Sequence, residues 1–144
     1  CRDNYSFCPS SMRIYSDGYT MVSNPSETGG GFVVMNELGE NLAEEIILKK
    51  GFTNNEAELK GVLKATELAG EFDTIVTDSR NTIAWIMSKK RKMKARPDLK
   101  EFADKALTNI LDKNLELIWE GRETNKAGIY IEFTLQQNFE KAFK

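Results

Sequence analysis

One stretch of the sequence decides the fold: Thr53-Asn54-Asn55-Glu56-Ala57-Glu58-Leu59-Lys60-Gly61-Val62-Leu63-Lys64-Ala65. Thr53 or Asn54 is a good helix N-cap, because a side-chain oxygen there accepts a hydrogen bond from the first turn. Glu56 follows Thr53 at the spacing of a capping box. From Leu59 onward, apolar residues recur every three or four positions, which predicts a helix with one buried face. Glu58 borders that face, and a helix packed on a sheet would direct it towards the sheet's edge. A solvated glutamate is the simpler interpretation of Glu58 taken alone.

The rest of the chain predicts strands on both sides of this helix. We expect strands at residues 13–16, 32–35, 42–50, 74–77 and 115–119, and further helices at 81–90, 97–112 and 127–143. Gly70 is the expected C-cap of the first helix. Three strands in hairpin order followed by alternating helices and strands predict an α/β fold, α+β in some schemes. The expected architecture is a five-stranded mixed sheet with helices on both faces.

Apolar spacing also predicts which side of each later helix is buried. The expected inward residues are Ile83, Ile86 and Met87 in the second helix, Leu99, Phe102, Ala106, Leu107, Ile110 and Leu111 in the third, and Ile129, Phe133, Phe139 and Phe143 in the last.

Length and composition limit the class of protein. A chain of 144 residues fits one domain, which we place at residues 12–144 after a polar tail at 1–11. A hydrophobic content of 40% argues against disorder, and no apolar run reaches the length of a membrane span. The first residues lack a signal-peptide pattern. We therefore expect a cytoplasmic protein, without a membrane segment and monomeric. A first residue that is Cys rather than Met suggests a fragment or a processed product.

Histidine and cysteine usage excludes several kinds of catalysis. The chain has no histidine, which removes nucleophiles activated by a histidine base, histidine-ligated zinc and histidine proton relays. Cys1 and Cys8 are the only cysteines. Two thiolates without other soft ligands cannot complete a tetrahedral zinc site. We expect reduced tail residues, with a disulfide or half of a metal site as the alternatives.

Positive charge is concentrated in one segment although the net charge is −2. Residues 89–96 carry six cations, at Lys89, Lys90, Arg91, Lys92, Lys94 and Arg96. Such a run is either a solvated face or a patch that contacts phosphates.

Three carboxylates are expected at one edge of the sheet. Asp17 and Asp78 each follow a predicted central strand, and ligands of open α/β sheets bind at that edge. Glu58 enters from the helix that follows the third strand. Clustered carboxylates raise one another's pKa, so a hard divalent cation such as Mg²⁺ is their natural partner. Two such ions, roughly 3.5–4 Å apart, would serve a phosphoryl transfer.

Five short segments follow one another in a characteristic order: Ile14-Tyr15-Ser16-Asp17-Gly18, Gly29–Gly31, Thr53-Asn54-Asn55 with Glu58-Leu59, Val76-Thr77-Asp78-Ser79, and Arg122 with Asn125-Lys126-Ala127. In their order and spacing, from Met12 to the C-terminus, the chain resembles type 1 ribonuclease H. The resemblance implies the ribonuclease H-like fold and hydrolysis of the RNA strand of an RNA–DNA hybrid. It further implies two Mg²⁺ or Mn²⁺ ions, and products with 5′-phosphate and 3′-hydroxyl ends. Asp17, Glu58 and Asp78 would be the catalytic metal ligands, with Asp17 near both ions.

The same resemblance implies a substrate surface. Its expected residues are Gly18, Asn54, Asn55, Trp85, Lys89, Lys90, Arg91, Lys92 and Asn125. Asn54 and Asn55 would lie in the substrate groove, where amides can exchange hydrogen bonds with the 2′-hydroxyls of RNA. The basic run falls where many family members have a protrusion that grips the DNA strand. Trp85, just before it, is alternatively a core residue.

One departure from the family concerns a fourth acid. The family usually has an aspartate four residues after the asparagine that matches Asn125, and this count leads to Ile129. Glu132 lies three residues further, on the same helical face. We expect Glu132 to supply the fourth metal ligand; the alternative is that it only neutralises the helix N-terminus. If the ligand is lost, the chain would be a weakly active or non-catalytic nucleic-acid-binding module. The family's mobile histidine is also absent, which suggests slower turnover.

Overall fold

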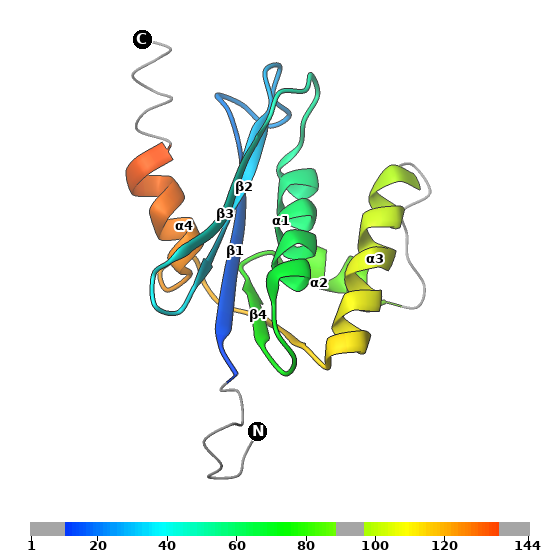
Figure 1. Ribbon diagram of the computed structural model, residues 1–144. Helices are drawn as coiled ribbons and strands as arrows, with labels where there is room; N and C mark the ends of the chain where they lie inside the picture. Colours follow the sequence, from blue (N-terminus) through cyan, green and yellow to red (C-terminus); the bar gives the residue numbers. More distant parts are fainter. Residues whose placement is uncertain (1–10, 89–96, 136–144) are drawn as a thin grey trace.

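The computed structural model in Figure 1 describes residues 11–88 and 97–135. The expected tail with its two cysteines, the basic run and the end of the last helix therefore lie outside the described residues. The elements are β1 (Arg13–Thr20), β2 (Gly30–Asn36), β3 (Asn41–Ile47), α1 (Asn54–Leu68), β4 (Thr74–Thr77), α2 (Arg80–Met87), α3 (Pro97–Lys113), β5 (Glu116–Trp119), α4 (Lys126–Tyr130) and a π-helical turn at Ile131–Leu135.

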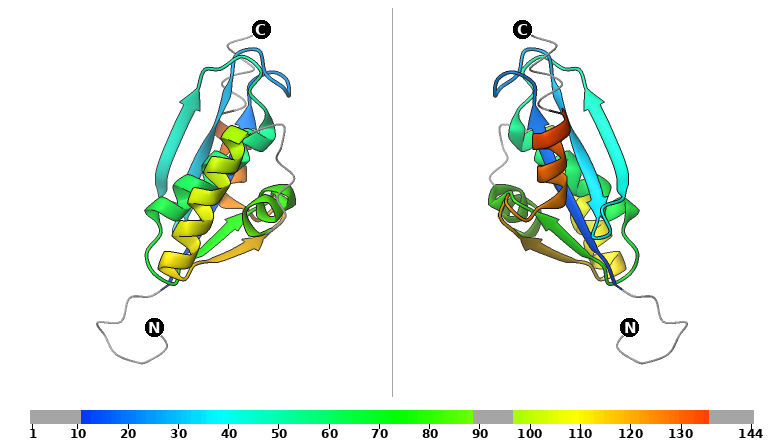
Figure 2. Two further views of the ribbon diagram at one scale, coloured as in Figure 1. Left: turned by 90° about the vertical axis from the view of Figure 1, so that its right-hand side faces the viewer. Right: turned by 90° about the vertical axis from the view of Figure 1, so that its left-hand side faces the viewer.

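The strands form the expected five-stranded mixed sheet in the order β3-β2-β1-β4-β5. The central strand β1 pairs antiparallel with β2 and parallel with β4. Helices α1 and α3 cover one face of the sheet, and α4 covers the other (Figures 1 and 2). None of the helices in the described ranges is long and apolar enough to cross a membrane.

Alternation along the strands supplies both cores. Ile14, Phe32 and Val34 join the core under α1 and α3. Tyr15 and Val33, their neighbours in sequence, face the opposite core with Ala127 and Ile131. Successive residues of a strand point to opposite faces, so a strand covered on both sides buries residues on both.

Side-chain caps hold both ends of α1. Thr53 is the N-cap and accepts a hydrogen bond from the amide of Glu56. At the other end, the Lys113 Nζ atom donates to the carbonyl oxygens of Thr66, Glu67 and Ala69 at 2.8–2.9 Å. The C-cap is Ala69 and not Gly70 as expected. An ammonium group that binds the last carbonyls makes a left-handed glycine unnecessary there.

Several expected inward faces were wrong. Met87 and Leu111 are 49% and 66% exposed. Met87 is the last residue of α2, whose buried residues are Thr82 and Ile86. In α4, the buried residues are Ala127 and Gly128, whereas Ile129 is exposed, as is Phe133 in the π-helical turn. Ala127 and Gly128 are small and let α4 approach β1 closely. The side of α4 that faces the sheet therefore carries these small residues and not the larger apolar ones.

Candidate metal centre

Asp17 lies inside β1 and not at its end, which corrects the expected strand boundary. The parallel pairing of β1 with β4 stops at Ser16 and Thr77. β1 nevertheless continues to Thr20, because β2 remains its partner on the other side, where Asp17 pairs with Val33. Asp17 and Asp78 are thus the first residues beyond the last pair of the parallel ladder. This register places the two carboxylates side by side.

Gly18 brings α1 close enough for Glu58 to join them. A Cβ atom at Gly18 would lie 2.5 Å from the carbonyl carbon of Ala57, so only glycine permits this approach. The Gly18 amide donates to Glu58 Oε1 at 3.2 Å and to Asp17 Oδ1 at 3.0 Å. Glu58 is 3% exposed, which excludes the solvated interpretation.

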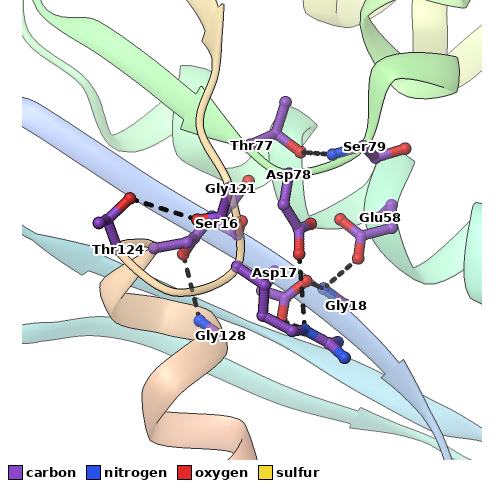
Figure 3. A network of polar contacts seen from close by, with 12 residues as sticks. Ser16, Asp17, Gly18, Glu58, Thr77, Asp78, Ser79, Gly121, Thr124 and Gly128 are labelled. Carbon is purple, nitrogen blue, oxygen red and sulfur yellow. Dashed lines mark hydrogen bonds and ion pairs between the residues drawn. The ribbon is translucent and has the colours of Figure 1, made fainter.

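The three expected carboxylates converge (Figure 3). Asp17, Glu58 and Asp78 each offer one oxygen, and the three oxygens lie within 4.8 Å of one another. Asp17 Oδ2 and Glu58 Oε2 are buried and have no hydrogen-bond partner. Buried carboxylate oxygens left in this state are costly unless a cation binds them. The donor set therefore fits a hard divalent ion, which takes oxygen ligands.

Burial and mutual repulsion raise the pKa of two of the acids, Glu58 and Asp78. Desolvation, followed by the charge of Asp17, raises the pKa of Glu58 well above its ordinary value. The same two causes raise the pKa of Asp78 to about 7, although the charge of Arg122 lowers it. Without a cation, the cluster therefore retains protons near neutral pH. A divalent ion would replace those protons and relieve the repulsion.

Arg122 supplies a cation that sequence reasoning did not single out. Its Nη2 atom lies 3.7 Å from Asp17 Oδ2, and its Nε atom lies 3.7 Å from Asp78 Oδ2. The side chain is 56% exposed and reaches the acids from the loop before α4. The one sequence signal for Arg122 was its position in the last of the segments that match the family. Loop geometry brings it to the cluster, and no periodicity predicts that.

A groove of about 610 Å³ opens beside the acids. It is lined by Asn54, Asn55, Glu58, Asp78, Ser79, Arg80, Asn81, Trp119 and Arg122. Asn54 and Asn55 thus lie beside two of the acids, as expected for substrate-groove residues. Trp85 is not among the lining residues and packs against the core under α1 and α3. Its placement favours the core alternative. Sequence reasoning missed Arg80 and Trp119.

Asn125 is buried, so its expected place on the substrate surface is corrected. It has no exposed area, and its amide donates to the carbonyl oxygen of Ser16 at 3.1 Å. Its Oδ1 atom accepts from the Gly128 amide and caps α4. Both contacts are internal. Asn125 therefore holds the start of α4 against the strand that carries Asp17.

Glu132 stays outside the acid cluster. It is exposed and belongs to the π-helical turn, while the cluster in the described residues consists of Asp17, Glu58 and Asp78. The part of α4 that touches Asp17 is Gly128, where a Cβ atom would lie 3.0 Å from Asp17 Oδ2. The structure therefore gives no support to Glu132 as a direct ligand.

Comparisons with known proteins give one family. A family model described as RNase H matches residues 9–132. The fold is similar to RNase H1 from the halophilic archaeon Halobacterium salinarum NRC-1, with a TM-score of 0.61, 21% identity and coverage of 82% of this chain and 91% of that one. A second similar structure is the N-terminal RNase H domain of Rv2228c from Mycobacterium tuberculosis, in a fusion with maltose-binding protein. Its TM-score is 0.62 at 22% identity, with coverage of 82% of this chain and 92% of that one.

A third similar structure is LC11-RNase H1, from compost metagenomics, in complex with an RNA/DNA hybrid. Its TM-score is 0.59 at 24% identity, with coverage of 93% of this chain and 100% of that one. Comparison with curated proteins gives no match. At these identities, the structural similarity establishes the fold.

Proposed function

The chain belongs to the ribonuclease H family, and from this premise we propose that it is an endoribonuclease that hydrolyses the RNA strand of RNA–DNA hybrids. One observation carries the proposal: three carboxylate oxygens converge within 4.8 Å of one another beside an open groove. A purely structural acid cluster would have its oxygens paired. Here Asp17 and Glu58 each keep one buried oxygen without a hydrogen bond.

We propose that Asp17, Glu58 and Asp78 hold two Mg²⁺ or Mn²⁺ ions. Such ions supply Lewis acidity, which activates water and stabilises charge on the reacting phosphate. Asp17 raises the pKa of both other acids, so it is the central carboxylate and the one suited to serve both ions. The Gly18 amide fixes one oxygen of Glu58 and leaves the other directed into the cluster.

Arg122 is suited to hold the phosphate to be cleaved. It is half exposed and reaches both Asp17 and Asp78. When cations neutralise the acids, its planar guanidinium becomes available to a phosphate, which it can bind through two parallel hydrogen bonds. We propose that hydrolysis leaves a 5′-phosphate on one product and a 3′-hydroxyl on the other.

Asn54 and Asn55 supply the preference for a strand with 2′-hydroxyls. Both line the groove at the first turn of α1, next to Glu58. A side-chain amide both donates and accepts, which matches a hydroxyl that does the same. The relative LC11-RNase H1 has been seen with an RNA/DNA hybrid, which supports the same substrate class for this chain.

A second candidate function is a weakly active or non-catalytic module that binds nucleic acid. It is favoured by the position of Glu132 outside the acid cluster, and by Ile129 at the position expected for the fourth acid. In that case the three acids would still bind cations, and hybrid would bind without being cut.

Cleavage of labelled substrates tests the proposal. Hybrid, double-stranded RNA and double-stranded DNA of one sequence are incubated with the protein in Mg²⁺ or Mn²⁺, with EDTA as a control and Asp17→Asn as the matched variant. We expect cuts in the RNA strand of the hybrid alone, and none with EDTA or the variant. Hybrid that binds but stays intact would support the second candidate, and equal cutting of all three duplexes would contradict the proposed specificity.

A further inference from the structure

Arg80 and Trp119 form a stack at the rim of the groove. The guanidinium carbon of Arg80 lies 4.2 Å from the centre of the Trp119 ring. Arg80 begins α2, and Trp119 ends β5, so the contact joins two separate elements. Both residues line the groove that also contains Glu58 and Asp78. A cation over an indole face is a favourable arrangement, and stacking restricts a side chain that otherwise samples many rotamers.

The stack is fixed to the acid cluster through the backbone. The indole Nε1 of Trp119 donates to the carbonyl oxygen of Asp78 at 3.1 Å. Asp78 contributes its carboxylate to the cluster, and Arg80 follows only two residues later. Two residues span at most about 7 Å of chain. The backbone of Arg80 is therefore close to the candidate metal centre, and the contact with Trp119 restricts where its guanidinium lies.

Arg80 keeps its donors for a ligand. Its side chain is exposed, and within residues 11–88 and 97–135 the contact found for its guanidinium is the Trp119 ring and not a carboxylate. Stacking occupies the face of the guanidinium plane, whereas the N–H groups lie within the plane and point away from the ring. A planar fork of this kind matches the oxygens of a phosphate. Because Arg80 already covers one face of Trp119, that face is not available to stack on a nucleobase.

We propose that Arg80, positioned by Trp119, binds the phosphate next to the scissile one on the cleaved strand. The inference rests on the proposed function, since it takes the acid cluster as the place of cleavage. Successive phosphates follow the strand at short intervals, so a cation near the cluster, but outside it, meets a neighbouring phosphate. The contact sets the position of the strand relative to the acids. Arg80 is therefore a substrate-binding residue, and Trp119 is the positioning residue that holds it.

Hybrids with one neutral methylphosphonate in the RNA strand test this contact. The modification is placed at each phosphate near the main cleavage site in turn, and KM and kcat are measured for the parent and for Arg80→Gln. With unmodified hybrid, Arg80→Gln should raise KM about tenfold, the size of one hydrogen bond to a charged group. At one position of the RNA strand, the methylphosphonate should raise the KM of the parent by a similar factor and leave the KM of Arg80→Gln unchanged.

Three further variants separate positioning from charge alone. Arg80→Lys keeps the charge without the planar fork, and Trp119→Leu removes the ring on which the guanidinium stacks. Each variant should raise KM for unmodified hybrid. In each, the methylphosphonate that weakens the parent should cause a smaller further rise in KM. Lys105→Gln removes a cation on α3, away from the groove, and should match the parent at every phosphate.

The outcomes distinguish this inference from the proposed function. If the parent cleaves hybrid but every modified phosphate weakens Arg80→Gln by the same factor as the parent, the phosphate contact is wrong while the function stands. If Arg80→Lys equals the parent throughout, charge alone accounts for the contact, and the positioning of a planar fork by Trp119 is wrong. If the parent cleaves no hybrid, the proposed function fails, and the phosphate contact fails with it.

Discussion

The side-chain amide of Asn125 donates a hydrogen bond to the carbonyl oxygen of Ser16, 3.1 Å away, although the two residues are 109 positions apart in the sequence. Ser16 directly precedes Asp17, and Asn125 also caps α4 through the amide of Gly128. One buried side chain thus joins the start of the last helix to the strand that carries the central acid. The position of Gly128 against Asp17 follows from this contact.

Asn125→Ala should therefore cost stability more than substrate affinity. It removes an N-cap and leaves a buried carbonyl without its partner, which together cost about 2–3 kcal/mol. Urea unfolding measures the loss, and Thr124→Ala, an exposed neighbour, serves as the control with a change within about 0.5 kcal/mol. A variant as stable as the parent but with a raised KM for hybrid would restore Asn125 to the substrate surface.

Sequence patterns predicted the sheet because its strands are short apolar runs between clear turn residues. The apolar runs at residues 32–35 in β2 and 75–76 in β4 are buried, and such runs are a strong signal. The ends of elements were harder to predict. β1 extends to Thr20 because β2 continues beside it, and neighbouring strands are not visible in local sequence. The face of α4 was wrong because Ala127 and Gly128 pack by close approach rather than by bulk.

The acid cluster was predictable in the same way, because Asp17 and Asp78 follow neighbouring strands and Glu58 lies one turn into a well-capped helix. The residues around the acids were not. Arg80 meets Trp119 across two elements distant in sequence. Arg122 reaches the acids from a loop. Such contacts depend on the distance between elements, which follows from packing and not from the spacing of residues.

Asp78→Asn should nearly abolish cleavage and weaken the response to metal. The variant keeps the shape of the side chain but replaces a charged ligand oxygen with an amide. We expect a loss of about 10²- to 10³-fold in kcat, as when one preorganised electrostatic group is deleted. Mn²⁺ at about 100 times its Kd should stabilise the parent by about 2.7 kcal/mol and the variant by much less. Thermal unfolding with and without Mn²⁺ measures this, and equal stabilisation of both proteins would place the ion elsewhere.

Removal of metal should make stability depend on pH. The folded pKa of Asp78 is about 7, above the ordinary 3.8, with Asp17, Glu58 and Arg122 as its charged neighbours. The folded state then binds more protons than the unfolded state between these values, so stability falls as pH rises through this window. In EDTA, the melting temperature should drop from pH 5 to pH 8, and less in Asp78→Asn. A parent melting temperature that rises over this range would contradict the burial of these acids.

Glu132 and Ile129 can be compared directly. Glu132 is exposed and outside the cluster, so Glu132→Gln should cleave hybrid within about twofold of the parent, as surface substitutions usually do. Ile129→Asp places a carboxylate one residue from Gly128, which lies against Asp17, and should lower the Mg²⁺ concentration needed for half-maximal rate. If Glu132→Gln loses most of its activity in Mg²⁺, Glu132 is a ligand after all, acting in a conformation other than this one.

The basic run at residues 89–96 remains a prediction, because it lies outside the described residues. If it contacts phosphates, replacing Lys89, Lys90 and Arg91 with glutamine should weaken hybrid binding and flatten its salt dependence. Each lost contact should reduce the slope of log affinity against log salt by about 0.7 to 0.9. Binding measured in EDTA over a range of salt concentrations decides this, with Lys105→Gln as the control. An unchanged slope would make the run a solvated surface.

The central claim is that Asp17, Glu58 and Asp78 together hold the ions that cleave hybrid RNA. The most direct measurement is single-turnover cleavage of a labelled hybrid across a Mn²⁺ titration, for the parent and for Asp17→Asn, which changes the acid shared by the other two. The account predicts metal-dependent cuts that leave 5′-phosphate and 3′-hydroxyl ends for the parent, and no cleavage by Asp17→Asn at any Mn²⁺ concentration. Equal rates for the two proteins, or cleavage by the parent in EDTA, would contradict it.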